Sequence, residues 1–207
     1  MARSRALALF LLALASTGAS VGEAAAKPQI VGINAAVLND VRIRSAGTPQ
    51  PRPAMVRQQV ALADQVQTGQ RSQLQVLLLD KSVFTVGANA QLVIDRFVYD
   101  PTGGRSFAAS VAKGAFRFMS GRPDRDGNGS VSTPVATIGI RGTIFDGVVG
   151  PDAVAIASGE SAIDRSIRAD PATASLIILR GPGQRTQSKA IPGAITVTAA
   201  GQTVSLD

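Results

Sequence analysis

The chain has 207 residues and a formal net charge of +7, and it contains neither cysteine nor histidine. These two absences exclude disulfides, thiol nucleophiles, histidine-assisted catalysis and the usual zinc sites. The composition is 45% hydrophobic but only 4% aromatic, so the core must be largely aliphatic. The many glycines and prolines favour short strands joined by turns over a helical bundle.

Residues 1–26 have the outline of a secretory signal peptide. Two arginines precede an apolar stretch, Ala6–Ala15, and the small residues Ala24–Ala26 supply a cleavage site. We therefore expect a periplasmic or secreted protein whose mature chain begins near Lys27; an uncleaved N-terminal anchor is the alternative. No later segment approaches about 18 continuous apolar residues, so no transmembrane span is expected in the mature chain.

The charge of the mature chain narrows the class of partner. Removing Arg3, Arg5 and Glu23 takes away +1 and leaves +6. A basic exported protein meets anionic glycans and lipids of the envelope. Nucleic acid is not expected, because the arginines are scattered without aromatic residues between them for base stacking. A solvated surface with excess arginine is the alternative to a binding patch.

Residues 27–59 are predicted to form N-terminal strands and a proline-rich loop. Ile30–Ile43 alternates weakly and predicts one or two strands, and residues 45–53 hold three prolines and a glycine. Met55–Val66 fits both helical and strand spacing, so periodicity leaves its structure open.

A clearer strand pattern follows from Ser72. Apolar residues alternate with others, and turns recur about every ten residues. The expected strands are Leu74–Leu78, Val83–Val86, Leu92–Tyr99, and two runs on either side of Gly114, one with Phe107, Ala109 and Val111 and one with Phe116 and Phe118. The pattern predicts an all-β domain, either a sandwich, a barrel or a solenoid-like form, and no block repeats at a fixed period.

The stretch Ser132–Val149 predicts a strand, a sharp bend and a second strand at the centre of this domain. Gly139 and Gly142 interrupt its apolar run, and Arg141 lies between them. Glycine within a strand indicates a bulge or the close approach of another backbone. A buried arginine needs an ionic partner, so Arg141 is predicted to be a buried structural residue. The alternative is a glycine-rich turn with Arg141 in solvent.

Asp80 and Asp95 are the carboxylates expected to pair with Arg141. Glycoside cleavage by carboxylates such as Asp80, Asp95, Asp100 or Asp146 is not expected, since aromatic residues to stack on a sugar are nearly absent. No catalytic residue and no cofactor are predicted, so the chain is not expected to be an enzyme.

One loop resembles the start of a calcium site. Asp124, Asp126, Asn128 and Ser130 have the spacing of oxygen ligands in an EF-hand loop. Val135, however, stands where a bidentate glutamate is required. We therefore predict a polar hairpin loop and no metal site, with calcium as the weaker alternative.

The C-terminal part changes composition. Residues 151–175 are rich in alanine and serine and are predicted to be a loop with at most one helical turn near Ile163. Residues 176–207 are predicted to hold a buried strand, Leu176–Leu179, and a hairpin formed by Ala194–Thr198 and Thr203–Leu206.

Four blocks, in order, resemble the FecR domain family of bacterial envelope proteins. Thr68-Gly69 and Ser72 fit an opening T-G-x-x-S motif. The other blocks are Leu77–Pro101, Ala112–Gly121 and the segment T-P-V-A-T-I-G-I-R-G-T, Thr133–Thr143, which holds the hallmark glycines and Thr143. The likeness covers Val60–Val149, from which we place a FecR-like β domain at residues 60–150.

The resemblance implies an extracytoplasmic binding or signal-relay module that acts on an envelope protein. FecR proteins proper span the membrane, sense a transporter outside and control a sigma factor inside. This chain shows no cytoplasmic N-terminal region and no internal span, so it is not expected to control a sigma factor by itself. The alternative function is a cell-surface structural or glycan-adhering module, which salt-sensitive binding to envelope glycans would favour.

Overall fold

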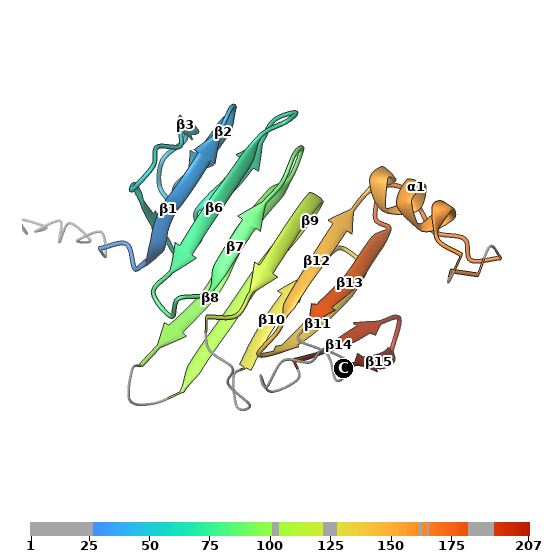
Figure 1. The fold of residues 1–207 in the computed structure, drawn as a ribbon. Coiled ribbons are helices and arrows are strands. Elements are labelled where there is room, and N and C mark those ends of the chain that lie inside the picture. The colour runs from blue at the N-terminus through green and yellow to red at the C-terminus, as the bar shows by residue number, and fades with distance from the viewer. Residues whose placement is uncertain (1–26, 101–103, 122–127, 162, 165, 182–192) are drawn as a thin grey trace, which may run out of the picture.

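The computed structural model describes residues 27–100, 104–121, 128–161, 163–164, 166–181 and 193–207. This part of the chain forms fifteen strands and one helix, so the expected all-β fold is confirmed (Figure 1). The elements are β1 (Ile30–Leu38), β2 (Val41–Arg44), β3 (Arg52–Pro53), β4 (Gln59–Ala61), β5 (Gln65–Thr68), β6 (Gln73–Leu78), β7 (Val83–Val86), β8 (Gln91–Tyr99), β9 (Arg105–Met119), β10 (Asn128–Ser132), β11 (Ala136–Arg141), β12 (Ile144–Val149), α1 (Pro151–Gly159), β13 (Ser175–Gly181), β14 (Ala194–Ala199) and β15 (Gln202–Leu206).

The strands form two sheets that share β9. The front sheet has the order β4-β1-β6-β7-β9-β12-β13, in which every neighbouring pair is antiparallel. The back sheet has the order β3-β2-β5-β8-β9-β10-β11-β14-β15, where β9 and β10 are parallel. Figure 1 shows β1, β6, β7, β12 and β13 side by side in the nearer layer.

β9 passes from the back sheet to the front sheet at Gly114. Residues 105–113 pair with β8 and β10, whereas residues 114–119 pair with β7 and β12. In a straight strand, Phe107 and Phe118 would lie about 36 Å apart, from eleven steps of about 3.3 Å. Their ring centroids are 5.1 Å apart, so the strand folds over. Gly114 has a φ of 87°, a conformation that suits glycine, and such bends form the corners of β-sandwiches.

The core lies between the two sheets. Phe84 of the front sheet and Phe107 of the back sheet have ring centroids 6.3 Å apart. The phenylalanines of the described residues are all buried, at positions 84, 97, 107, 116, 118 and 145. Aliphatic side chains such as Val31, Leu74 and Ile138 fill the remaining space, which agrees with the low aromatic content.

Several predicted elements are confirmed. Ile30–Ile43 forms two strands, β1 and β2, and Met55–Val66 contributes β4 and the start of β5 rather than a helix. The run around Gly114 forms one continuous bent strand instead of two. The C-terminal hairpin is present as β14 and β15, with Ala200 and Gly201 at positive φ in its turn.

Two predictions for the C-terminal part are wrong. Residues 151–175 are not all loop, because α1 occupies Pro151–Gly159. Pro151 opens this helix, Asp152 lies in its first turn, and three alanines favour helical structure. The strand at Leu176–Leu179 is also not fully buried, since β13 is the last strand of the front sheet among the described residues. Leu176, Ile177 and Leu179 are half-buried and Ile178 is exposed.

No helix among the described residues has the length and apolar character needed to cross a bilayer.

Candidate functional site

The outer face of the front sheet carries few charges. The strands β1, β4, β6, β7, β12 and β13, together with residues 114–119 of β9, contain three charged residues, which are Arg117, Asp146 and Arg180. By contrast, the back sheet exposes charged side chains on several strands, including Arg42 and Arg44 of β2. The two outer faces of the sandwich therefore differ in chemistry.

An apolar row crosses five strands of this face. Ile33 of β1 lies opposite Leu77, Leu77 opposite Val83, Val83 opposite Met119, and Met119 opposite Ile144. Ile33, Leu77 and Met119 are 36–39% exposed, and Val83 and Ile144 are half-buried. Contiguous exposed apolar side chains mark interaction surfaces more often than isolated ones do. We call these five residues the apolar row.

The apolar surface extends beyond the row. Leu79 lies in the turn directly after β6 and is 53% exposed, and Ile178 of β13 lies opposite Asp146. Beside the row the face is hollowed, with a volume of about 550 Å³, and the small residues Gly87 and Ala115 contribute to its lining. Val83 and Met119 of the row line the hollow, which extends across the sheet from β6 to β13 and also takes in Arg117 and Asp146.

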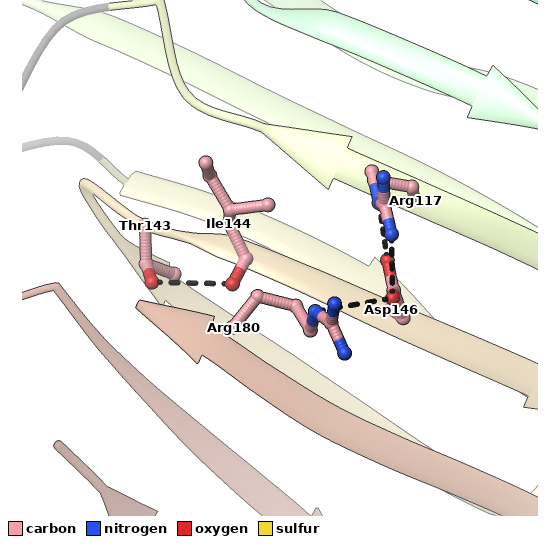
Figure 2. A network of polar contacts seen from close by, with 5 residues as sticks. All are labelled: Arg117, Thr143, Ile144, Asp146 and Arg180. Atoms are coloured by element: carbon pink, nitrogen blue, oxygen red, sulfur yellow. Dashed lines mark hydrogen bonds and ion pairs between the residues drawn. The ribbon is translucent and has the colours of Figure 1, made fainter. Parts of the chain in front are cut away.

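The three charged side chains meet next to the row. Arg117 donates two hydrogen bonds to the carboxylate of Asp146, from Nε to Oδ1 at 2.6 Å and from an Nη to Oδ2 at 2.9 Å (Figure 2). Arg180 approaches Oδ2 with its Nε at 3.7 Å, which is an ion pair without a hydrogen bond. The hydrogen bonds to Asp146, and then the attraction between the charges, raise the pKa of the Arg117 guanidinium.

The prediction that Arg141 is a buried ion-pair member is wrong. Arg141 is exposed, at the end of β11, because the buried residues Ile138 and Ile140 occupy the alternate positions that face the core. Gly139 forms no bulge, because it pairs in regular register with Thr196 of β14. A Cβ on Gly139 would lie 2.5 Å from Oγ1 of Thr196, so the close neighbour is a side chain and not another backbone.

The two carboxylates expected to pair with Arg141 lie elsewhere. Asp80 is buried in the turn between β6 and β7, where its Oδ1 accepts from the backbone N–H of Ser82 and its Oδ2 from the Ser82 hydroxyl, both at 2.9 Å. Asp95 is exposed on β8 and accepts a hydrogen bond of 2.6 Å from the Ser110 hydroxyl. Asp80 therefore shapes a turn, and neither carboxylate joins Arg141 in one site.

Gly142 and Thr143 form the predicted bend between β11 and β12. Gly142 has a φ of 48°, and Thr143 is buried. The Thr143 hydroxyl donates to the carbonyl oxygen of Gly181 at 3.3 Å, and the Thr143 carbonyl accepts from the N–H of Ser120. Figure 2 shows this threonine beside Ile144, away from the charged trio of Arg117, Asp146 and Arg180. The bend thus ties the ends of β9 and β13 together.

The opening T-G-x-x-S motif is also structural. The Thr68 hydroxyl donates to the carbonyl of Gly87 at 2.5 Å and accepts from the N–H of Ala90 at 2.8 Å. The Ser72 hydroxyl accepts from the N–H of Asp40 at 3.1 Å. Both hydroxyls therefore hold turns in place, and neither is available for a ligand.

The candidate calcium loop lies partly outside the described residues, which omit Asp124 and Asp126. Asn128 and Ser130 belong to β10, which pairs with β9 and β11, and Val135 is exposed in the turn that follows. Val135 occupies the loop position at which a calcium site requires a carboxylate.

Sequence reasoning missed both the apolar row and the charged trio. One local signal was present at Leu77, where the alternation of β6 calls for a polar residue on the outer face. The rest depends on register, because Ile33 and Ile144 are distant in sequence and are aligned only by the intervening strands.

Residues 64–164 match the model of the family described as FecR protein. No curated protein and no solved structure matches the chain. The matched span runs from the start of β5 past α1. The front-sheet strands β4, β1 and β13 lie outside it. Membership of this family indicates a domain related to signal transduction. The chain is therefore a FecR domain-containing protein, with its FecR domain at residues 64–164.

Proposed function

We propose that this protein is an exported, non-enzymatic binding module that docks another envelope protein on the outer face of its front sheet, as part of a signal relay. The apolar row is the observation that carries the proposal. Water contact with side chains such as Leu77 and Met119 is unfavourable, and a partner that covers them gains roughly 25 cal/mol for each Å² buried. The family match supports a role in signalling, and the predicted leader at residues 1–26 supports export.

A matched pair of variants tests whether the outer face of the front sheet is the docking face. Met119→Lys places a charge in the middle of the apolar row, and Thr137→Lys places the same charge at an exposed position of the back sheet. Each protein is immobilised and exposed to solubilised envelope, and the captured proteins are compared with those held by the wild type. Met119→Lys should lose the partner that the wild type and Thr137→Lys retain. Equal capture by all three proteins would contradict the proposal.

The same preparation tests export. The protein recovered from the envelope fraction should begin at Lys27, because the predicted cleavage follows Ala26. An intact Met1 would show that the leader is retained.

The back sheet favours a second candidate function, adhesion to an anionic glycan. Its outer face presents a mostly polar row of residues in register, with five hydroxyl-bearing residues and one arginine: Arg44, Gln65, Val93, Ser110, Ser132, Thr137, Thr198 and Thr203. Against this function, the described phenylalanines are buried and cannot stack on sugar rings. Binding to purified envelope glycans that is lost in high salt and in Arg44→Ala would favour adhesion over protein docking.

A further inference from the structure

We propose that the outer face of the front sheet accepts an amphipathic helix whose apolar side lies along the apolar row and whose flank presents a carboxylate to Arg180. This inference rests on the proposed docking function and names the chemistry of the partner. It makes Arg180 a specificity-determining residue, because this arginine selects an acidic segment.

The shape of the apolar row suits a helix. Neighbouring strands lie about 4.8 Å apart, so the five residues of the row span about 19 Å across the sheet. An α-helix repeats every 5.4 Å, so a helix laid along the row presents about one apolar side chain to each strand over three to four turns. The adjacent hollow of about 550 Å³ gives room for larger side chains of the helix.

Charge indicates an acidic partner. The front-sheet strands carry two arginines and one aspartate, a net charge of +1, and all three side chains converge beside the row. Arg117 already donates two hydrogen bonds to Asp146. Arg180 holds the same carboxylate only at 3.7 Å, and its side chain is 55% exposed. A second carboxylate beside Arg180 would neutralise the net charge of +1 and would accept hydrogen bonds from the Arg180 guanidinium.

The same arithmetic disfavours a second copy of this chain. Two front faces brought together would place four arginines against two aspartates, an arrangement with a charge surplus and no acceptor for it. The segments of this chain outside the described residues do not carry a net negative charge that would balance this surplus either. Residues 1–26 carry two arginines and one glutamate, residues 122–127 carry two arginines and two aspartates, and residues 182–192 carry one arginine and one lysine without an acid.

A charge-swap experiment tests the proposal. The probes are three synthetic helical peptides of about fifteen residues, each with leucines on one face and with Glu, Gln or Lys at one flanking position. Their binding to the purified full-length protein is measured by fluorescence anisotropy. The Glu peptide should bind the wild type about tenfold more tightly than the Gln peptide, and the Lys peptide should bind most weakly.

Two variants separate the parts of the inference. Arg180→Ala should bind the Glu and Gln peptides equally, and Arg180→Glu should prefer the Lys peptide, whereas Arg141→Ala on the back sheet should behave as wild type. If no peptide binds the wild type, if Glu and Gln peptides bind equally, or if the protein dimerises through the row in place of peptide binding, the inference is overturned. The proposed function fails separately, when Met119→Lys captures the envelope partner as well as the wild type does.

Discussion

Gly114 and Ala90 are in direct backbone contact: a Cβ on Gly114 would lie 2.5 Å from the Cβ of Ala90 and 2.7 Å from its nitrogen. The contact joins the corner of β9 to the turn before β8. Because both halves of β9 depend on this corner, it fixes how the front sheet lies over the back sheet.

Gly114→Ala should therefore destabilise the whole domain. The substitution forces a side chain into a left-handed conformation, at about 1–2 kcal/mol, and overpacks the corner, at about 1–3 kcal/mol. We expect the free energy of unfolding to fall by roughly 2–5 kcal/mol in urea titrations. Gly104→Ala is the matched control, since a Cβ there meets nothing within 4 Å, and it should unfold near the wild-type midpoint. A wild-type midpoint for Gly114→Ala would show that the corner tolerates a side chain.

Thr68→Val tests whether the opening motif is structural. Valine keeps the shape of the side chain but leaves the buried N–H of Ala90 without its acceptor. Losing a buried hydrogen-bond partner costs about 1–3 kcal/mol, which should appear as a lower melting temperature. Thr198→Val removes an exposed hydroxyl and should change stability by no more than about 0.5 kcal/mol. If the two variants melt alike, the Thr68 hydroxyl has no structural role.

Arg141→Ala should leave the urea midpoint within about 0.5 kcal/mol of wild type, because the side chain is exposed. Asp80→Ala should lower the stability by about 1–3 kcal/mol, because it removes the acceptors of the buried Ser82 N–H and hydroxyl. A large loss of stability in Arg141→Ala alone would restore the interpretation of this arginine as a structural ion-pair member.

Calcium should not stabilise the protein. A ligand present at about 100 times its dissociation constant adds about 2.7 kcal/mol, which shifts the melting temperature by several degrees. Because Val135 replaces the bidentate glutamate, we expect an unchanged melting temperature in millimolar calcium. A stabilisation that Asp126→Ala abolishes would show that the loop binds calcium.

These positions show what local sequence determines and what it does not. Val83–Val86 alternates, is bounded by turn residues, and forms β7 as predicted. Arg141 shows how a local argument fails: its glycine neighbours suggest burial, but the phase of the strand directs it outward. The helix α1 was missed because alanine favours helix whereas serine and glycine favour loops, and the segment has no apolar stripe to decide between the two.

The docking face depends on long-range register, which local patterns do not contain. Arg117 and Asp146 are opposite one another only because β9 and β12 pair in that register. Arg180 is the extra residue of β13 at a shift in its register with β12. The break at Gly114 predicts two separate strands. The pattern does not show that the chain continues as one bent strand, or which faces the bend brings together.

Site-specific photo-crosslinking in living cells tests the central claim most directly. A photoreactive residue is placed at Met119, in the apolar row, or at Thr137, which is exposed on β11 of the back sheet. If the front face docks an envelope protein, irradiation should join one partner to the Met119 variant and should leave the Thr137 variant uncrosslinked. A crosslink at Thr137 with none at Met119 would contradict the assignment of the docking face.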